Sequence, residues 1–479
     1  MNALVLVTQP KALSTDSLER AIALVRATCE RCLILGDIRR HEVDTRGLAV
    51  ENRIPPDDHE SLIQWIESQL DLIELSTPTL IVCIGPTVTV ARYTAERMSG
   101  QQVSESAWEV ISSNFARFAY LGTHRSLGSL IPRDTAKWLK GLKEEFGSKQ
   151  ILSSLRSVRG LQIGLLGESI IDEYLMCEAL GKVSKDPLIA FSVRSSEEQL
   201  GGVLAVARHM SGLGAHPVVF SEISRGDAET LEAEYQANFD LTRCRILEER
   251  PLVKTRFVDR TSNSRVFETY RFGGQISNRV SDLTIESHLK EWANPLIVVD
   301  YGHGLITDAM RNIINDRSAL TAVNAQSNAG NRGFNPISKY SGAQMTFLNG
   351  SEVEVETRRR AIDLQSLVSD LGSELQTEEF YVTNGASGLI VWTKSSVHLQ
   401  IPGMAPTVID RTGAGDALLA TVAVMRFAGV PVKIAAFFGN IAGALMCGVL
   451  GNSLSISATL LEREARQILD EVTRGSRYN

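Results

Sequence analysis

The chain has 479 residues, of which 43% are hydrophobic and 22% charged, a composition typical of an ordinary globular protein with two or three domains. Its formal net charge is -7 and its Lys and Arg residues form no concentrated stripe, so we expect no nucleic acid as its main partner. Six scattered cysteines indicate reduced thiols, and no signal peptide is visible at the start. We therefore expect a cytoplasmic protein.

The first part of the chain, residues 1–150, alternates strand and helix patterns. Short apolar runs predict strands at Ala3–Val7, Cys32–Leu35 and Thr79–Ile84. Apolar residues at helical spacing predict helices after Asp16, after Asp57 and from about Val88. This alternation indicates a small α/β domain. An amphipathic helix is predicted over Asp134–Phe146, and Gly147–Gln150 reads as the linker that ends the domain.

From Leu161 onward, buried strands alternate with polar loops. Apolar runs predict strands at Leu161–Leu166, Leu296–Val299, Thr321–Ala325, Met345–Leu348 and Glu379–Thr383. Alternating segments over 174–199, 254–258 and 266–272 are typical of hairpins, as are 389–392 and 397–400. Asp172 follows the first of the buried strands, and open α/β sheets bind ligands outside such strand ends. A solvated loop acid is the alternative reading of Asp172.

A glycine-rich stretch, Ile409–Ala417, leads into an apolar helical pattern that runs to Phe427. Glycines allow tight turns, and the first amides of a helix are unpaired and carry partial positive charge, so this turn can bind a phosphate. Asp416, one step further, can accept the proton of a hydroxyl beside that phosphate, as phosphoryl transfer to an alcohol requires. The alternative is a helix-start carboxylate without a catalytic role.

The stretch from Ile434 to Leu461 contains no charged residue and is long enough to span a bilayer. It is interrupted by Asn440 and by the break at Gly451–Ser453. We therefore predict a fully buried helix in a large α/β core, and no membrane partner.

The residues Asp410, Gly413, Ala414, Gly415 and Asp416 resemble the C-terminal signature of PfkB/ribokinase-type carbohydrate kinases. Further motifs of that family follow in the family's order. They are Gly167 to Asp172, Gly201-Gly202, Asp300-Tyr301 with Gly304, Asn349 with Glu352, and Thr383 to Gly388. The resemblance implies a ribokinase-like three-layer α/β/α domain with a small β lid over residues 151–479. It also implies ATP and Mg²⁺ as cofactors and a sugar or sugar phosphate as substrate.

The resemblance also implies a role for each matching residue. Asp416 would be the base, and the amides of Gly413, Ala414 and Gly415 would form the anion hole. The sugar would be held by Asp172, Gly201 and Gly202, and the nucleotide by Asn384, Gly385, Asp410 and Asn440. Asn349 and Glu352 would order Mg²⁺ through water, which suits an ion that keeps several of its waters.

Two departures bear on the substrate. Val206 stands where the family has a sugar-binding Asn, and Asn324-Ala325-Gln326 stands where it usually has Asp-Pro. Among the branches of the family, the chain most resembles the heptose-7-phosphate kinases, on the evidence of Asp300–Gly304 and Gly451–Ser453. These residues do not name the sugar.

Some kinases of this family are fused to a nucleotidyltransferase domain with a His-x-Gly-His motif after its first strand. Residues 8–13 contain no His, so we expect residues 1–150 to form a degenerate or unrelated domain that transfers no nucleotide. Two alternatives remain, a bifunctional kinase and nucleotidyltransferase and a non-catalytic kinase-like protein that binds a sugar nucleotide. The resemblance also leaves room for a homodimer.

Overall fold

The computed structural model describes six short strands within residues 2–121 by their backbone alone, and residues 133–474 apart from 236–239, 261–263, 274–282, 361–362, 396–397 and 406–407. The chain divides into two compact units, Met1–Leu130 and Ile131–Asn479. Helix α4 (Arg133–Ser153) belongs to the second unit and is interrupted at Gly147, whose φ is 71°. The residues predicted as a linker therefore lie within this helix, and the units divide earlier than about residue 150.

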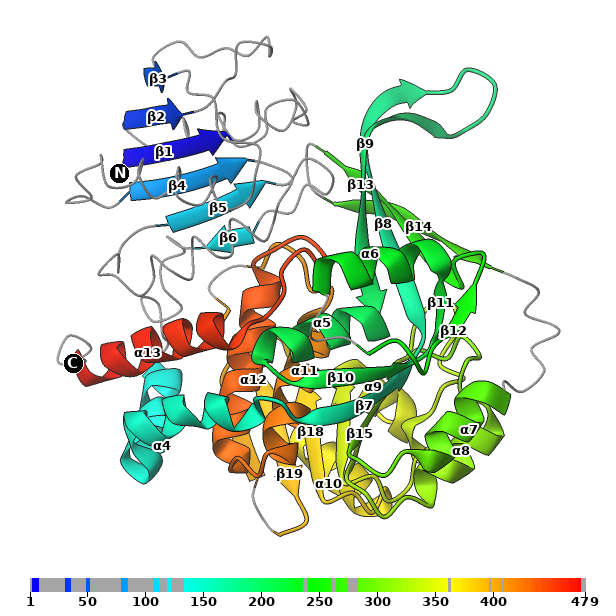
Figure 1. Ribbon diagram of the computed structural model, residues 1–479, viewed down its shortest axis with the longest axis vertical. Helices are drawn as coiled ribbons and strands as arrows, with labels where there is room; N and C mark the ends of the chain where they lie inside the picture. Colours follow the sequence, from blue (N-terminus) through cyan, green and yellow to red (C-terminus); the bar gives the residue numbers. More distant parts are fainter. Residues whose placement is uncertain are drawn as a thin grey trace. The chain divides into compact units, whose positions relative to one another are not determined.

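The first unit contains a six-stranded sheet in the order β3-β2-β1-β4-β5-β6 (Figure 1). Its neighbouring strands are parallel except for the antiparallel pair β5–β6. The strands are β1 (Asn2–Val7), β2 (Arg31–Leu35), β3 (Ala49–Glu51), β4 (Thr79–Ile84), β5 (Ala107–Ile111) and β6 (Ala119–Leu121). The three strands predicted here are confirmed, whereas the predicted helices and residues 8–13 lie outside the described residues.

The second unit is built on an eight-stranded sheet in the order β10-β7-β15-β16-β17-β18-β19-β20. Its strands are parallel from β10 to β18, and β19 and β20 complete it as an antiparallel edge. The strands are β7 (Gln162–Gly167), β10 (His216–Phe220), β15 (Leu296–Asp300), β16 (Thr321–Ala325), β17 (Met345–Asn349), β18 (Glu379–Thr383), β19 (Leu389–Thr393) and β20 (His398–Ile401). All the strands predicted for this sheet are confirmed. Every residue of β15 and β16 is buried, as expected for parallel strands that are covered on both faces.

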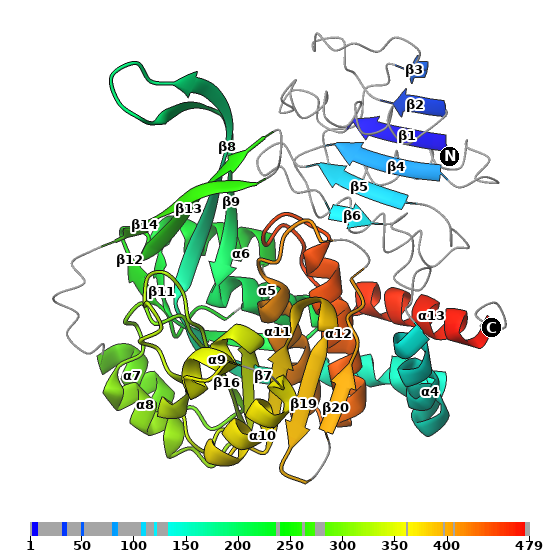
Figure 2. The same cartoon turned by 180° about the vertical axis from the view of Figure 1, so that it is seen from behind.

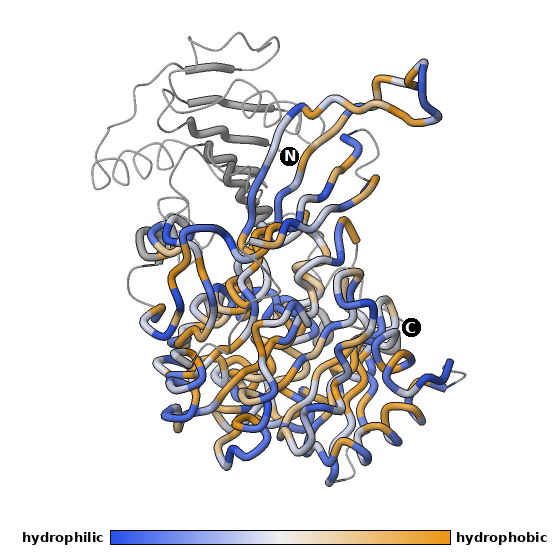
Figure 3. Tube along the Cα trace, turned by 90° about the vertical axis from the view of Figure 1, so that its right-hand side faces the viewer, coloured by the Kyte–Doolittle hydropathy of each residue, from blue (hydrophilic) through white to orange (hydrophobic). Residues whose placement is uncertain are grey.

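Helices cover both faces of this sheet, so the predicted three-layer α/β/α arrangement is confirmed (Figures 1 and 2). One face carries α5 (Val203–Leu213), α11 (Ala414–Phe427) and α12 (Val432–Cys447). The other carries α7 (Leu283–Glu291), α8 (Asp308–Asn315), α9 (Gly350–Thr357) and α10 (Leu364–Glu374), whose apolar side chains pack against the strands. Hydrophobic segments run through the interior of the unit (Figure 3).

Further helices of the described residues complete the unit. Helix α13 (Ala458–Arg474) packs against α4 and α12, and α6 (Arg225–Tyr235) lies beside the small pair β11 (Glu222–Ser224) and β12 (Arg245–Leu247). Helix α12 is buried as predicted, but it ends at Cys447, so the uncharged stretch up to Leu461 is not one continuous helix. Among the described residues, no helix combines the length and the apolar character that crossing a membrane requires.

A second, four-stranded sheet projects from the end of β7, in the order β14-β13-β8-β9 (Figure 1). We call this sheet the lid; its strands are β8 (Ser169–Lys182), β9 (Ile189–Gly202), β13 (Leu252–Asp259) and β14 (Arg265–Phe272). Strands β8 and β9 form an antiparallel hairpin, and so do β13 and β14, while β8 and β13 are parallel. The predicted lid is confirmed. Its base begins at Ser169, directly after the carboxyl end of β7.

Candidate active site

Asp416 lies in the first turn of α11 and is almost fully buried, with 8% of its surface exposed. Its Oδ1 accepts hydrogen bonds from the phenol of Tyr301 (3.1 Å) and from Nε2 of Gln326 (3.4 Å). Burial raises the pKa of Asp416 to about 6, against the lowering effect of the Tyr301 hydrogen bond. Asp172 raises this pKa further and Lys254 lowers it, so both charges act on Asp416.

The turn before Asp416 has the geometry of an anion site. Gly413 adopts the left-handed conformation (φ 76°), and no side chain caps the amides of α11 in the part of the chain that the structure describes. A Cβ atom at Gly413 would lie 2.0 Å from Oδ1 of Asn452, so a larger residue here would have to displace Asn452 and also adopt a left-handed conformation. The first-turn amides, which include those of Gly415 and Asp416, therefore face outward without a side-chain acceptor.

Asp172, the predicted sugar-binding carboxylate, sits on lid strand β8 and is already engaged. Its Oδ1 pairs with Arg256 (2.5 Å), and its Oδ2 accepts a hydrogen bond from Nδ2 of Asn452 (3.1 Å). Gly201 packs directly on it, because a Cβ there would lie 2.3 Å from the same Oδ2. Gly202 precedes α5 with a φ of 59°, which favours glycine. Asp172, Gly201 and Gly202 are thus brought together, and Asn452 joins them to Gly413.

Asp410 belongs to the glycine-rich stretch 409–417, which we call the anion loop, and it binds the lid. Its two carboxylate oxygens accept hydrogen bonds from Nη2 of Arg265 at 2.7 and 2.8 Å, and the same Nη2 contacts Oγ1 of Thr412. The amides of Thr412 (3.1 Å) and Gly451 (3.0 Å) also donate to Asp410. Although burial raises the pKa of Asp410, Arg265 and these amides together bring it below its usual value. Arg265 therefore links β14 of the lid to the predicted phosphate site.

Asn349 and Glu352 bind each other at the start of α9. Oδ1 of Asn349 accepts a hydrogen bond from the backbone amide of Glu352 (2.9 Å), and Oε2 of Glu352 accepts one from the backbone amide of Asn349 (2.8 Å). These two hydrogen bonds form a capping box. Oε1 of Glu352 accepts the amide of Ser327 (3.1 Å). Burial raises the pKa of Glu352 to about 7, and Asp416 contributes to that rise. Within the described ranges no group of three or more His, Cys, Asp or Glu side chains could hold a metal.

The predicted nucleotide contacts lie further along the sheet. The amide of Asn384 donates to the carbonyl of Gly388 (2.7 Å) and closes the turn that contains Gly385. Asn440, on α12, donates its side-chain amide to the carbonyl of Pro402 (2.8 Å). This bond gives Asn440 a structural role. A contact of Asn384, Gly385 or Asn440 with a nucleotide stays a prediction.

The sequence did not predict the residues that hold Tyr301 against Asp416. Glu168 accepts the amides of Tyr301 and His303, each at 3.0 Å, through its two carboxylate oxygens. Burial, reinforced by Asp300, raises the pKa of Glu168 to about 7. Glu168 therefore fixes the backbone of the turn that follows β15.

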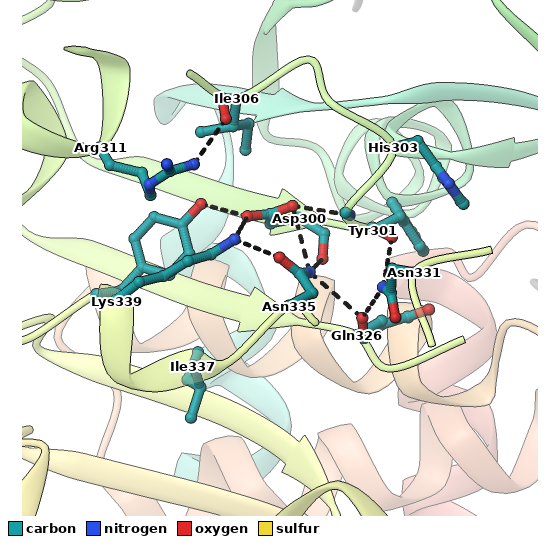
Figure 4. A network of polar contacts seen from close by, with 12 residues as sticks. Asp300, Tyr301, His303, Ile306, Arg311, Gln326, Asn331, Asn335, Ile337 and Lys339 are labelled. Carbon is teal, nitrogen blue, oxygen red and sulfur yellow. Dashed lines mark hydrogen bonds and ion pairs between the residues drawn. The ribbon is translucent and has the colours of Figure 1, made fainter. Parts of the chain in front are cut away.

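An asparagine-rich loop holds the same turn from the other side (Figure 4). Asn331 donates to the carbonyls of Tyr301 (2.9 Å) and Gln326 (2.7 Å), and Asn335 donates to the carbonyl of Asp300 (2.8 Å). The carboxylate of Asp300 in turn accepts hydrogen bonds from Gly302, Tyr340 and Lys339. In the sequence, the run of asparagines after β16 was the only indication of this loop. The fold shows that these asparagines bind the backbone of the turn after β15. Gln326, in the stretch 324–326 where the family usually has Asp-Pro, lies beside Asp416.

Comparisons with known proteins agree with this architecture. Residues 166–459 match the pfkB family of carbohydrate kinases. Among curated proteins, the chain is 24% identical over 327 residues to the bifunctional protein HldE of Helicobacter hepaticus, covering 63% of each chain. It is 26% identical over 336 residues to the bifunctional protein HldE of Pelobacter propionicus, covering 66% of each. The chain thus matches less than two thirds of the length of these relatives.

Solved structures show the same fold. Ribokinase from Thermotoga maritima superposes with a TM-score of 0.51 at 16% identity, covering 64% of this chain and 99% of that one. Phosphofructokinase-2 from Escherichia coli gives a TM-score of 0.52 at 13% identity, covering 66% of this chain and 100% of that one. The second unit therefore has the ribokinase-like fold, and with the match over residues 166–459 the chain belongs to the pfkB family of carbohydrate kinases.

Proposed function

We propose that this carbohydrate kinase transfers the γ-phosphoryl group of ATP to a hydroxyl of a sugar or sugar phosphate, with a heptose phosphate as the first candidate acceptor. The observation that carries the proposal is Asp416, buried at an uncapped helix start and hydrogen-bonded to Tyr301. A carboxylate next to a phosphate-binding turn can accept the hydroxyl proton as the new bond to phosphorus forms.

The electrostatics of Asp416 suit this role. A general base works best when its pKa lies near the working pH, and burial brings that of Asp416 to about 6. The amides that follow Gly413 would donate hydrogen bonds to the charge that develops on the phosphoryl group. Asp172, with Gly201 and Gly202 packed beside it, would hold the sugar near Asp416.

The residues present also fit the proposed cofactors. Carboxylate and amide oxygens are ligands that Mg²⁺ accepts, and the capping box leaves Asn349 and Glu352 suited to contact through the ion's waters rather than directly. Bound Mg²⁺ would neutralise charge on the phosphates. Asp410, Asn384, Gly385 and Asn440 are proposed to border the nucleotide. Asp410 would do so from the anion loop itself.

The heptose phosphate rests on the relatives named HldE and on the sequence resemblance to heptose-7-phosphate kinases. We propose that the kinase comprises residues 151–479 together with α4. We also propose that the first unit is a degenerate nucleotidyltransferase-like domain, because residues 8–13 contain no His.

The test is a panel of sugars and sugar phosphates, heptose phosphates included, assayed for ADP release from ATP and Mg²⁺. We expect acceptor-dependent ADP release that disappears in Asp416→Asn. If nucleotide binds but no acceptor in the panel stimulates ADP release, the non-catalytic binding protein is favoured instead. Pyrophosphate release from ATP or CTP with a sugar 1-phosphate would show the bifunctional alternative.

A further inference from the structure

Lys254, on lid strand β13, is a buried cation without a partner. The residue is 7% exposed, and within the part of the chain that the structure describes its amine makes no hydrogen bond or ion pair. The amine lies instead over two aromatic rings, 5.2 Å from the centre of Tyr270 and 5.6 Å from that of Tyr301. Lys254 belongs to none of the family motifs named above.

The carboxylates near Lys254 are engaged elsewhere. Those that act on it electrostatically are Asp172, Glu268, Glu168 and Asp416, and the nearby cation is Arg256. Arg256 and Asn452 bind Asp172, Tyr270 donates to Glu268 (3.0 Å), backbone amides bind Glu168, and Tyr301 donates to Asp416. The positive charge of Lys254 is therefore available to a ligand.

The strand register fixes where this charge points. Lys254 pairs with Asp172 across β13 and β8, and with Tyr270 across β13 and β14. Thr255 binds Glu173 (2.6 Å) on the opposite face of the sheet, because successive side chains alternate. Lys254 thus lies on the face that carries Asp172. The ring of Tyr301 contacts the amine of Lys254, and the hydroxyl of the same Tyr301 donates a hydrogen bond to Asp416.

A buried, unpaired ammonium group is costly, and contact with aromatic rings offsets only part of that cost. Burial lowers the pKa of Lys254, although Asp172 acts in the opposite direction. A charged side chain that is buried without a counter-charge is a candidate for function, because a ligand can supply that counter-charge.

We propose that Lys254 is a further catalytic residue, which binds the phosphoryl group while it passes to the acceptor oxygen between Asp172 and Asp416. This inference rests on the proposed kinase function. The bond from the γ-phosphorus to the bridging oxygen of ADP breaks, and its electron pair stays on ADP. The bond from the acceptor oxygen to phosphorus forms, and the hydroxyl proton goes to Asp416. Lys254 donates hydrogen bonds to the phosphoryl oxygens and keeps its own protons.

The probe is ADP with Mg²⁺ and aluminium fluoride, which mimics a phosphoryl group in transit and requires no knowledge of the sugar. Binding of ADP–Mg²⁺ is measured by calorimetry with and without aluminium fluoride. We compare the natural protein with Lys254→Met, which keeps the length of the side chain, and with Lys254→Arg, which keeps the charge. Lys182→Met, at an exposed position of the same lid, is the matched control.

We expect aluminium fluoride to tighten ADP binding in the natural protein and in Lys182→Met. Lys254→Met should lose about tenfold or more of that gain while its affinity for ADP–Mg²⁺ alone stays the same, and Lys254→Arg should recover part of the gain. The midpoint of thermal unfolding of Lys254→Met should be unchanged or higher, because a buried unpaired charge has been removed.

An undiminished effect of aluminium fluoride in Lys254→Met would overturn the role of Lys254 and leave the kinase proposal intact. Failure of the natural protein to bind ADP–Mg²⁺ would overturn both. A large drop in the unfolding midpoint of Lys254→Met would mark a structural lysine and overturn the catalytic role. Reductive methylation of the natural protein needs no variant, and Lys254 should be protected by ADP–Mg²⁺ with aluminium fluoride but not by ADP–Mg²⁺ alone.

Discussion

Tyr301 donates its phenolic hydrogen to Oδ1 of Asp416 over 3.1 Å, and the two residues are 3% and 8% exposed. The phenol comes from the turn after β15 and the carboxylate from the first turn of α11. Because Glu168 and Asn331 hold the backbone of Tyr301 from two sides, the phenol is pre-positioned. This hydrogen bond favours the ionised form of Asp416, which is the form that a general base requires.

Tyr301→Phe should therefore reduce activity at the acid end of the pH range in which the enzyme works. Losing a hydrogen bond that favours the charged form raises the pKa of Asp416 above its present value of about 6. A rise of about one unit is expected for a hydrogen bond to a charged group. The acid limb of the pH profile of kcat/KM should move upward by that amount. Tyr340→Phe, which removes a similar phenol from Asp300, is the control and should leave the limb in place.

Asp416→Asn tests the base directly. The amide keeps the shape of the side chain but cannot take up the hydroxyl proton, so turnover should fall by about 10²–10⁴-fold while ATP still binds. If Asp416 were only a helix-start residue, Asn would replace it with little effect, because the two cap almost equally well. Asp363→Asn, at the exposed start of α10, provides that comparison. Turnover close to that of the natural protein would contradict the catalytic assignment.

Glu352→Gln should weaken the response to Mg²⁺ several-fold and leave α9 intact, because Gln can also complete a capping box. The pKa of about 7 adds a pH test. In the natural protein, Mg²⁺ should act more weakly as the pH falls below 7 and Glu352 gains a proton, whereas the variant should lose this dependence. Glu356→Gln on the same helix, where Glu356 binds the amides of Ile337 and Ser338, is the control. Identical Mg²⁺ titrations would remove Glu352 from the site.

Gly413→Ala should destabilise the second unit by about 1–2 kcal/mol or more, because a left-handed conformation is costly for a residue with a Cβ. The new atom would also meet Asn452, which binds Asp172, so sugar-dependent turnover should fall as well. Gly415→Ala is the matched control, since a Cβ there meets nothing within 4 Å and helical Ala is favoured over Gly. Urea unfolding of both variants measures the difference. Equal stabilities would show that the loop can relax.

Truncation tests where the kinase begins. Leu139 and Leu142 of α4 are buried, and Lys433 pairs with Glu145 of the same helix (2.5 Å). A fragment of residues 131–479 should fold and bind ADP. A fragment of residues 151–479 loses both leucines, at about 1.5–3 kcal/mol each, and should unfold at lower temperature. If both fragments unfold at the same temperature, α4 contributes nothing and the predicted boundary at about 150 holds.

The sequence by itself determined the layers of the second unit. Strands such as Leu296–Val299 and Thr321–Ala325 are nearly continuous apolar runs, and the apolar stretch after Asp416 has helical length. Such patterns are local, because burial on both faces of a parallel strand requires an apolar residue at each position. The glycines before Asp416 and the alternating lid segments were recognisable for the same reason.

Only the tertiary structure decided what those residues touch. Tyr301 binds Asp416, and Arg265 of the lid binds Asp410. Asn452 binds Asp172 and packs next to Gly413. In each case the partners are far apart in the chain. In the sequence, Lys254 is only one polar residue of an alternating strand. The fold shows that the carboxylates around it already have partners. Local pattern follows from the chemistry of neighbouring residues, whereas pairing, burial and pKa depend on which distant side chains the fold brings within a few ångströms.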